Sequence, residues 1–104
     1  MRFQKIIRNH SNSYYIVIGM LKKLIYKSHY RGTKEGDFIL SSFAAHALEN
    51  CSNDDIKAYE NLLEYTDAEI QGWVLSAQNA PVHLRKIILK IAGFHDFDNT
   101  SLAQ

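Results

Sequence analysis

Apolar residues recur three and four positions apart through most of this sequence, and this spacing is the strongest constraint on its fold. Such spacing lines one face of a helix, whereas a half-buried strand alternates apolar and polar residues. No segment keeps that alternation long enough to predict a strand. We therefore expect an all-α protein. Its apolar faces comprise Leu21, Leu24 and Ile25; Leu40, Phe43, Ala44, Ala47 and Leu48; Ile56, Tyr59, Leu62 and Leu63; Ile70, Trp73, Val74 and Ala77; and Leu84, Ile87, Ile88 and Ile91.

Residues that suit a helix start or stop separate these faces. Ser and Thr cap a first turn through their side-chain oxygens, Pro fits a first turn, and Gly adopts the left-handed conformation after a last turn. Residues of these types stand at Gly32, Thr33, Ser52, Thr66, Pro81 and Gly93. The pattern predicts a single small antiparallel bundle of about five short helices.

The chain of 104 residues is long enough for one such domain. We expect the helical domain to cover residues 20–93, because the regular spacing begins at Met20. The polar residues 94–104 are expected to form a flexible tail. Residues 1–19 are interpreted as a basic N-terminal extension or leader, and a signal peptide, a transit peptide and a misassigned start before Met20 all stay open.

Charge is divided unevenly along the chain. Residues 1–34 contain eight Lys and Arg and no acid, whereas residues 35–104 contain four Lys and Arg and all eleven acids. An acid-free segment of this kind suits a phosphate, an anionic membrane or an acidic protein surface as partner. The asymmetry alone does not choose between them.

Signatures of catalysis, metal binding and membrane insertion are missing from the sequence. Cys51 is the only cysteine, and the five histidines lack the spacing of a metal site. No nucleotide-binding glycine motif or nucleophile elbow occurs, and no apolar run is long enough to span a membrane. We expect no enzyme activity, no catalytic, cofactor-binding or metal-binding residues, and a core position for Trp73.

The turn sequence Arg31-Gly32-Thr33-Lys34-Glu35 has two interpretations. In the first, Arg31 complements the end of one helix dipole and Glu35 the start of the next, with Gly32 turning the chain. In the second, Gly32 exposes backbone to a partner, and the flanking opposite charges fix the orientation of docking.

Two motifs together resemble the succinate dehydrogenase assembly factor family, the SdhE-type flavinators, some of which are described as antitoxin-like. The first is R-G-x-x-E after a basic helix with a Tyr-x-Ser stretch, and the second is LL-x-x-x-D-x-x-[LI]-x-x-W. The first is matched by Tyr26, Ser28, Arg31, Gly32, Glu35 and Asp37, and the second by Leu62, Leu63, Asp67, Ile70 and Trp73. Gly36 departs from the larger apolar residue usual in the family, which we expect to weaken the second helix by ~0.5–1 kcal/mol.

The resemblance implies an assembly factor that binds the flavoprotein subunit of succinate dehydrogenase, and in some members that of fumarate reductase. It promotes covalent attachment of FAD to that subunit and holds no permanent cofactor. The implied partner-binding residues are Tyr30, Arg31, Gly32, Glu35 and Asp37. The free protein is expected to be a monomer, in the cytoplasm of a bacterium or the mitochondrial matrix of a eukaryote.

Two other functions stay open. Some family members suggest an antitoxin that binds a small toxin. The basic N-terminal third would suit a nucleic-acid binder, but no aromatic-interleaved basic patch or recognition helix supports this, and we expect no nucleic-acid partner.

Overall fold

The computed structural model describes residues 11–29 and 31–96. Within them lie five α-helices, two short 3-10 helices and no strand, which confirms the all-α prediction. The elements are α2 (Ser11–His29), α3 (Lys34–His46), η1 (Leu48–Asn50), α4 (Asn53–Leu62), α5 (Asp67–Leu75), η2 (Ala77–Asn79) and α6 (Val82–Phe94).

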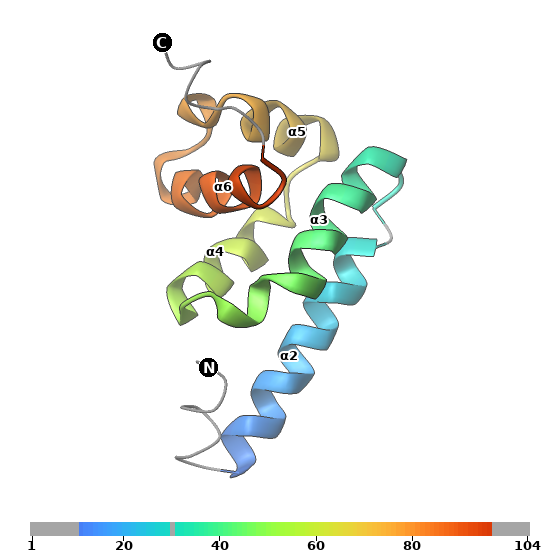
Figure 1. Ribbon diagram of the computed structural model, residues 1–104, viewed down its shortest axis with the longest axis vertical. Coiled ribbons are helices and arrows are strands. Elements are labelled where there is room, and N and C mark those ends of the chain that lie inside the picture. The colour runs from blue at the N-terminus through green and yellow to red at the C-terminus, as the bar shows by residue number, and fades with distance from the viewer. Residues whose placement is uncertain (1–10, 30, 97–104) are drawn as a thin grey trace.

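The long helix α2 and the helix α3 form an antiparallel hairpin along one side of the molecule (Figure 1). Helices α4, α5 and α6 lie together on the other side, and α6 contacts α3, α4 and α5. The RGTKE turn closes the hairpin at the end where α2 finishes and α3 starts. This arrangement brings it close to the connection between α4 and α5.

The predicted helix starts are confirmed at three caps. The side chains of Thr33 and Ser52 accept hydrogen bonds from the backbone N–H groups of Gly36 and Asp55. Thr66 forms a complete capping box with Glu69. These contacts satisfy N–H groups that have no partner inside the helix, so the local sequence is enough to fix each start.

One hydrogen-bonded chain in the core joins three helices. The single Ser28 hydroxyl proton is shared between two acceptors, the Leu24 carbonyl at 2.7 Å and the Tyr59 hydroxyl oxygen at 2.6 Å. Tyr59 donates in turn to the Leu40 carbonyl at 3.0 Å. Both polar side chains are fully buried, and their hydrogen bonds offset the cost of that burial. Helices α2, α3 and α4 are therefore tied together by polar contacts as well as by apolar packing.

Most of the predicted apolar residues form the core. The buried apolar side chains are Leu21, Leu24, Leu40, Phe43, Ala44, Leu48, Ile56, Tyr59, Leu62, Ile70, Val74, Ala77, Ala80, Leu84, Ile87, Ile88, Ile91 and Ala92. Trp73 is an exception to the prediction. It packs at the edge of the core and remains half-buried, with its ring edge-on to Tyr65 at a centroid distance of 5.1 Å.

Two predicted helix limits are wrong. Helix α2 begins at Ser11, so Met20 lies inside it, and Val17 and Ile18 already pack against the core. Helix α6 continues through Gly93 to Phe94, and it is Asp96 that takes the positive φ of 60° after its end.

The separate role assigned to residues 1–19 stays a prediction. Tyr30 and residues 1–10 and 97–104, the greater part of the predicted tail, lie outside the described residues.

Candidate functional site

The chain reverses direction at the RGTKE turn, between the end of α2 at His29 and the start of α3 at Lys34. Gly32 has a φ of 109°, a conformation that residues with a side chain rarely adopt. Thr33 then takes an extended conformation and caps α3. The prediction that glycine provides the turn is therefore confirmed, and its backbone is exposed.

Arg31 points into the molecule and joins the turn to the α4–α5 connection. Its Nε donates to Asp67 Oδ1 at 2.5 Å, Nη1 donates to the Leu63 carbonyl at 2.9 Å, and Nη2 donates to the Tyr65 carbonyl. The side chains of Arg31 and Asp67 are only 11% and 7% exposed. Neither sequence interpretation anticipated this contact, because both placed Arg31 at the surface. The guanidinium group holds together two segments that are distant in the sequence.

Asp67 also accepts a hydrogen bond from the turn itself. The Thr33 hydroxyl donates to Asp67 Oδ2 at 2.6 Å, so the two carboxylate oxygens have different donors. Gly36 makes room for this contact, since a Cβ added there would lie 2.5 Å from Asp67 Cγ and 2.7 Å from Thr33 Oγ1. The expectation that Gly36 weakens the start of α3 stays a prediction, and the structure gives this residue a second role. Its missing side chain lets Asp67 approach.

The other predicted partner-binding residues differ in their exposure to solvent. Asp37 is half-buried and accepts a 2.8 Å hydrogen bond from the Arg31 backbone N–H. Gly32 and Glu35 are exposed, and the Glu35 side chain makes no hydrogen bond or ion pair with the described residues. Tyr30 lies outside those residues. Within the turn, a partner has direct access to Gly32 and Glu35.

An apolar surface continues from Glu35 along α3. Phe38 lies one helical turn further on and is 64% exposed, which is high for a phenylalanine. Together with Lys34, Glu35 and Ile39 it lines an open hollow of about 470 Å³. The ring of His95 lies 5.7 Å from that of Phe38. Sequence reasoning gave no role to Phe38 or Asp67, although Asp67 belongs to the second motif.

Burial strongly perturbs one titratable group beneath the turn. It raises the pKa of the Tyr59 hydroxyl far above its ordinary value, while the Ser28 hydrogen bond and the positive charge of Arg31 act in the opposite direction. Tyr59 is consequently neutral at any physiological pH. Its hydroxyl serves as a structural hydrogen-bond donor to Leu40.

Neither a metal-binding cluster nor a membrane-crossing helix occurs in the described residues. No group of three or more His, Cys, Asp or Glu side chains there is arranged to hold a metal ion. No helix in residues 11–29 and 31–96 has the length and apolar character needed to cross a membrane.

Comparison with known proteins connects this turn to a family. A family model described as "Flavinator of succinate dehydrogenase" matches residues 22–95, which include the turn and all its bonded partners. The chain belongs to this family. No solved structure matches it.

Relatives of this flavinator-family chain are named for the assembly of succinate dehydrogenase. It is 32% identical over 74 residues to succinate dehydrogenase assembly factor 2, mitochondrial, of Dictyostelium discoideum, covering 71% of this chain and 52% of that protein. It is 39% identical over 61 residues to the protein of that name from Schizosaccharomyces japonicus, covering 59% and 43%. The chain thus spans about half the length of these curated relatives, and nothing in the matches supports the antitoxin alternative.

Proposed function

We propose that this chain binds the flavoprotein subunit of succinate dehydrogenase and promotes covalent attachment of FAD to it. The observation that carries the proposal is the flavinator-family match over residues 22–95. The intact, internally bonded RGTKE turn within that range supports it. We further propose that the fumarate reductase flavoprotein is a second client in organisms that contain one.

The mechanism we propose is positioning of the client. A factor that holds a flavoprotein and its FAD in a reactive arrangement lowers the entropic part of the barrier, even without supplying a reacting group. The factor then needs neither a catalytic side chain nor a bound cofactor, and FAD remains with the client. In a eukaryote this takes place in the mitochondrial matrix, which agrees with the names of the relatives, and in a bacterium in the cytoplasm.

Residues of the turn are proposed to act in two ways. Gly32 and Glu35 contact the flavoprotein, because their backbone and carboxylate are exposed. Arg31 and Asp37 hold that contact surface in place from inside the protein. Arg31 does so through its ion pair with Asp67, and Asp37 does so by accepting a hydrogen bond from the Arg31 backbone N–H. Tyr30, next in sequence, is proposed as a further contact.

Complex formation tests the proposal. The chain would be mixed with purified flavoprotein subunit that carries no covalent FAD, and the mixture analysed by size-exclusion chromatography with light scattering. We expect a complex of one copy of each, formed by a factor that is monomeric when free. Flavoprotein already joined to its iron–sulfur subunit is the control and should not bind. Separate elution of the two proteins, both with and without added FAD, would contradict the proposal.

A further inference from the structure

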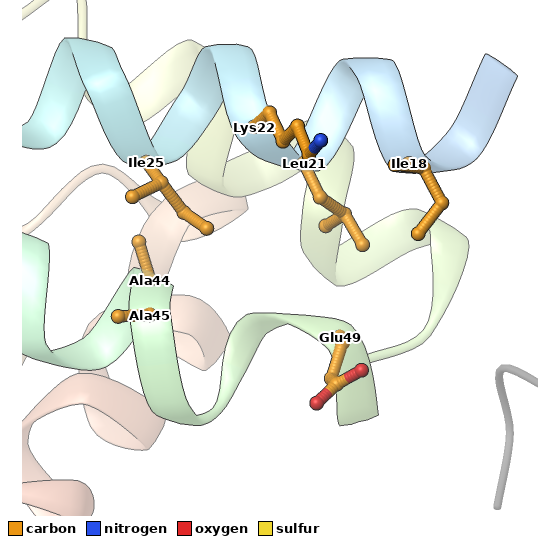
Figure 2. A pocket seen from close by; sticks show the side chains of 7 residues that line it. All are labelled: Ile18, Leu21, Lys22, Ile25, Ala44, Ala45 and Glu49. Atoms are coloured by element: carbon orange, nitrogen blue, oxygen red, sulfur yellow. The ribbon is translucent and has the colours of Figure 1, made fainter. Parts of the chain in front are cut away.

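A groove between α2 and α3 lies at the opposite end of the hairpin from the RGTKE turn. Figure 2 shows Ile18, Leu21 and Ile25 extending from α2 toward α3 and η1. Ala44 points toward them from α3 and Ala45 lines the same space, which has a volume of about 180 Å³. A cavity of ~150 Å³ already accommodates benzene, so the groove has room for one large apolar side chain.

Unpaired positive charge borders this groove. Lys22 lines it, and Lys23 and Lys27 follow on the outer face of α2. All three are exposed, and no ion pair among the described residues involves them. Helix α2 contains no acidic residue, and the only acid that lines the groove is Glu49, from η1. The three ammonium groups are thus available to carboxylates from outside.

We propose that the groove and these three lysines form a second docking surface, which binds an acidic amphipathic segment of the client flavoprotein. One large apolar side chain of that segment fills the groove, and its carboxylates face Lys22 and Lys23. Lys27 adds to the field that attracts the segment. The inference rests on the proposed function, because it assigns the segment to the same client.

The shape of the surface favours a protein over other anionic partners. The apolar part is concave and formed by half-buried Ile18 and Ile25. A concave apolar pocket takes a single side chain from a protein segment, while phosphate or lipid headgroups gain nothing from it.

Charge reversal tests the lysines. The affinity for purified flavoprotein subunit would be measured by titration for the wild type, for the Lys22→Glu/Lys23→Glu double variant, and for Lys57→Glu. Lys57 is exposed on α4, makes no ion pair with the described residues, and provides a control for charge reversal elsewhere on the surface. We expect the double variant to bind roughly tenfold more weakly in low salt, with a smaller difference in high salt, and Lys57→Glu to bind as the wild type does.

Filling the groove tests the apolar part independently. Ala45→Trp places a large ring at an exposed position in the groove, and Val82→Trp places the same ring at an exposed position on α6. We expect at least tenfold weaker binding only for Ala45→Trp, with melting temperatures confirming that both variants fold.

The outcomes separate the two proposals. A wild-type chain that does not bind the flavoprotein overturns the proposed function, and this inference with it. A wild-type chain that binds, with unchanged affinity in the charge-reversal and groove variants, overturns the second docking surface alone. Vesicles containing phosphatidylserine and a duplex RNA serve as additional probes. Lysine-dependent binding to either, without any effect on the flavoprotein, would also overturn it.

Discussion

Replacing Arg31 should lower the stability of this protein, because its side chain links two segments of the chain inside the fold. Arg31→Ala removes three side-chain hydrogen bonds and leaves Asp67 buried with only the Thr33 hydroxyl as partner. Breaking a buried ion pair by removing one partner typically costs ~3–5 kcal/mol. Asp67 is the first residue of α5, where the helix dipole returns ~0.3–1 kcal/mol. A net loss of roughly 3 kcal/mol is expected.

That loss is large for a small domain. Total stabilities are ~5–15 kcal/mol, and each kcal/mol shifts the melting temperature of a domain of this size by ~4–8 °C. Arg31→Ala should therefore lower the melting temperature by at least about 12 °C. A surface arginine that only complements a helix dipole would cost ~0.3–1 kcal/mol, which is a shift of no more than about 8 °C.

Urea denaturation followed by circular dichroism would measure the effect, with Arg85→Ala as control. Arg85 donates to two carbonyl groups, those of Ala80 and Gln78, but pairs with no carboxylate in the described residues. A double-mutant cycle with Asp67→Ala should give a coupling energy of about 1–3 kcal/mol. An Arg31→Ala loss no larger than that of Arg85→Ala, or additive effects of Arg31→Ala and Asp67→Ala, would refute the internal role.

Three further predictions concern the packing around the turn and the core. Gly36→Ala should lower the urea midpoint despite the better helix propensity of alanine, because its Cβ would meet Asp67 Cγ at 2.5 Å; a raised midpoint would contradict the close approach. Tyr59→Phe should reduce the loss of folding stability that the wild type shows at alkaline pH. The raised pKa of Tyr59 means that its contribution to stability is complete below about pH 10 and is lost as the pH rises above that value. The difference in unfolding free energy between the wild type and Tyr59→Phe should therefore fall by up to ~1.4 kcal/mol per pH unit in denaturation series above pH 10. Trp73→Ala should cost about 2 kcal/mol in thermal melts, less than the ~3–5 kcal/mol of a fully buried tryptophan, and a loss within the latter range would place Trp73 in the core.

Features that depend on neighbouring residues could be predicted from the sequence. The caps at Thr33, Ser52 and Thr66 are recognisable because a side chain and its backbone donor lie three residues apart. The apolar faces are similarly defined by repetition within one helix. The positive φ at Gly32 follows from the same local logic.

Features that depend on distant residues could not be predicted. The Arg31–Asp67 pair joins positions 36 apart, and no local rule connects them. Gly36 looked like a weak helix residue because the side chain that needs its space comes from another helix. The helical spacing of Trp73 with Ile70 and Val74 predicts a core position, but its place on α5 leaves it at the edge of the core.

The yield of covalent FAD on the purified flavoprotein subunit tests the proposed flavinylation function directly. The subunit would be incubated with FAD alone, with the wild-type chain, with Glu35→Ala or with the control Glu64→Ala, and then denatured so that only covalent flavin fluoresces on the gel. Both glutamates are exposed and make no ion pair among the described residues. Glu64→Ala should therefore melt as wild type, and Glu35→Ala, which removes an acid from the first turn of α3, should cost only ~0.3–1 kcal/mol and stay folded. We expect the wild-type chain and Glu64→Ala to raise the yield above that with FAD alone, and Glu35→Ala to lose most of the increase. An equal yield with and without the wild-type chain would contradict the flavinylation function, and a full yield with Glu35→Ala would contradict the role of the turn.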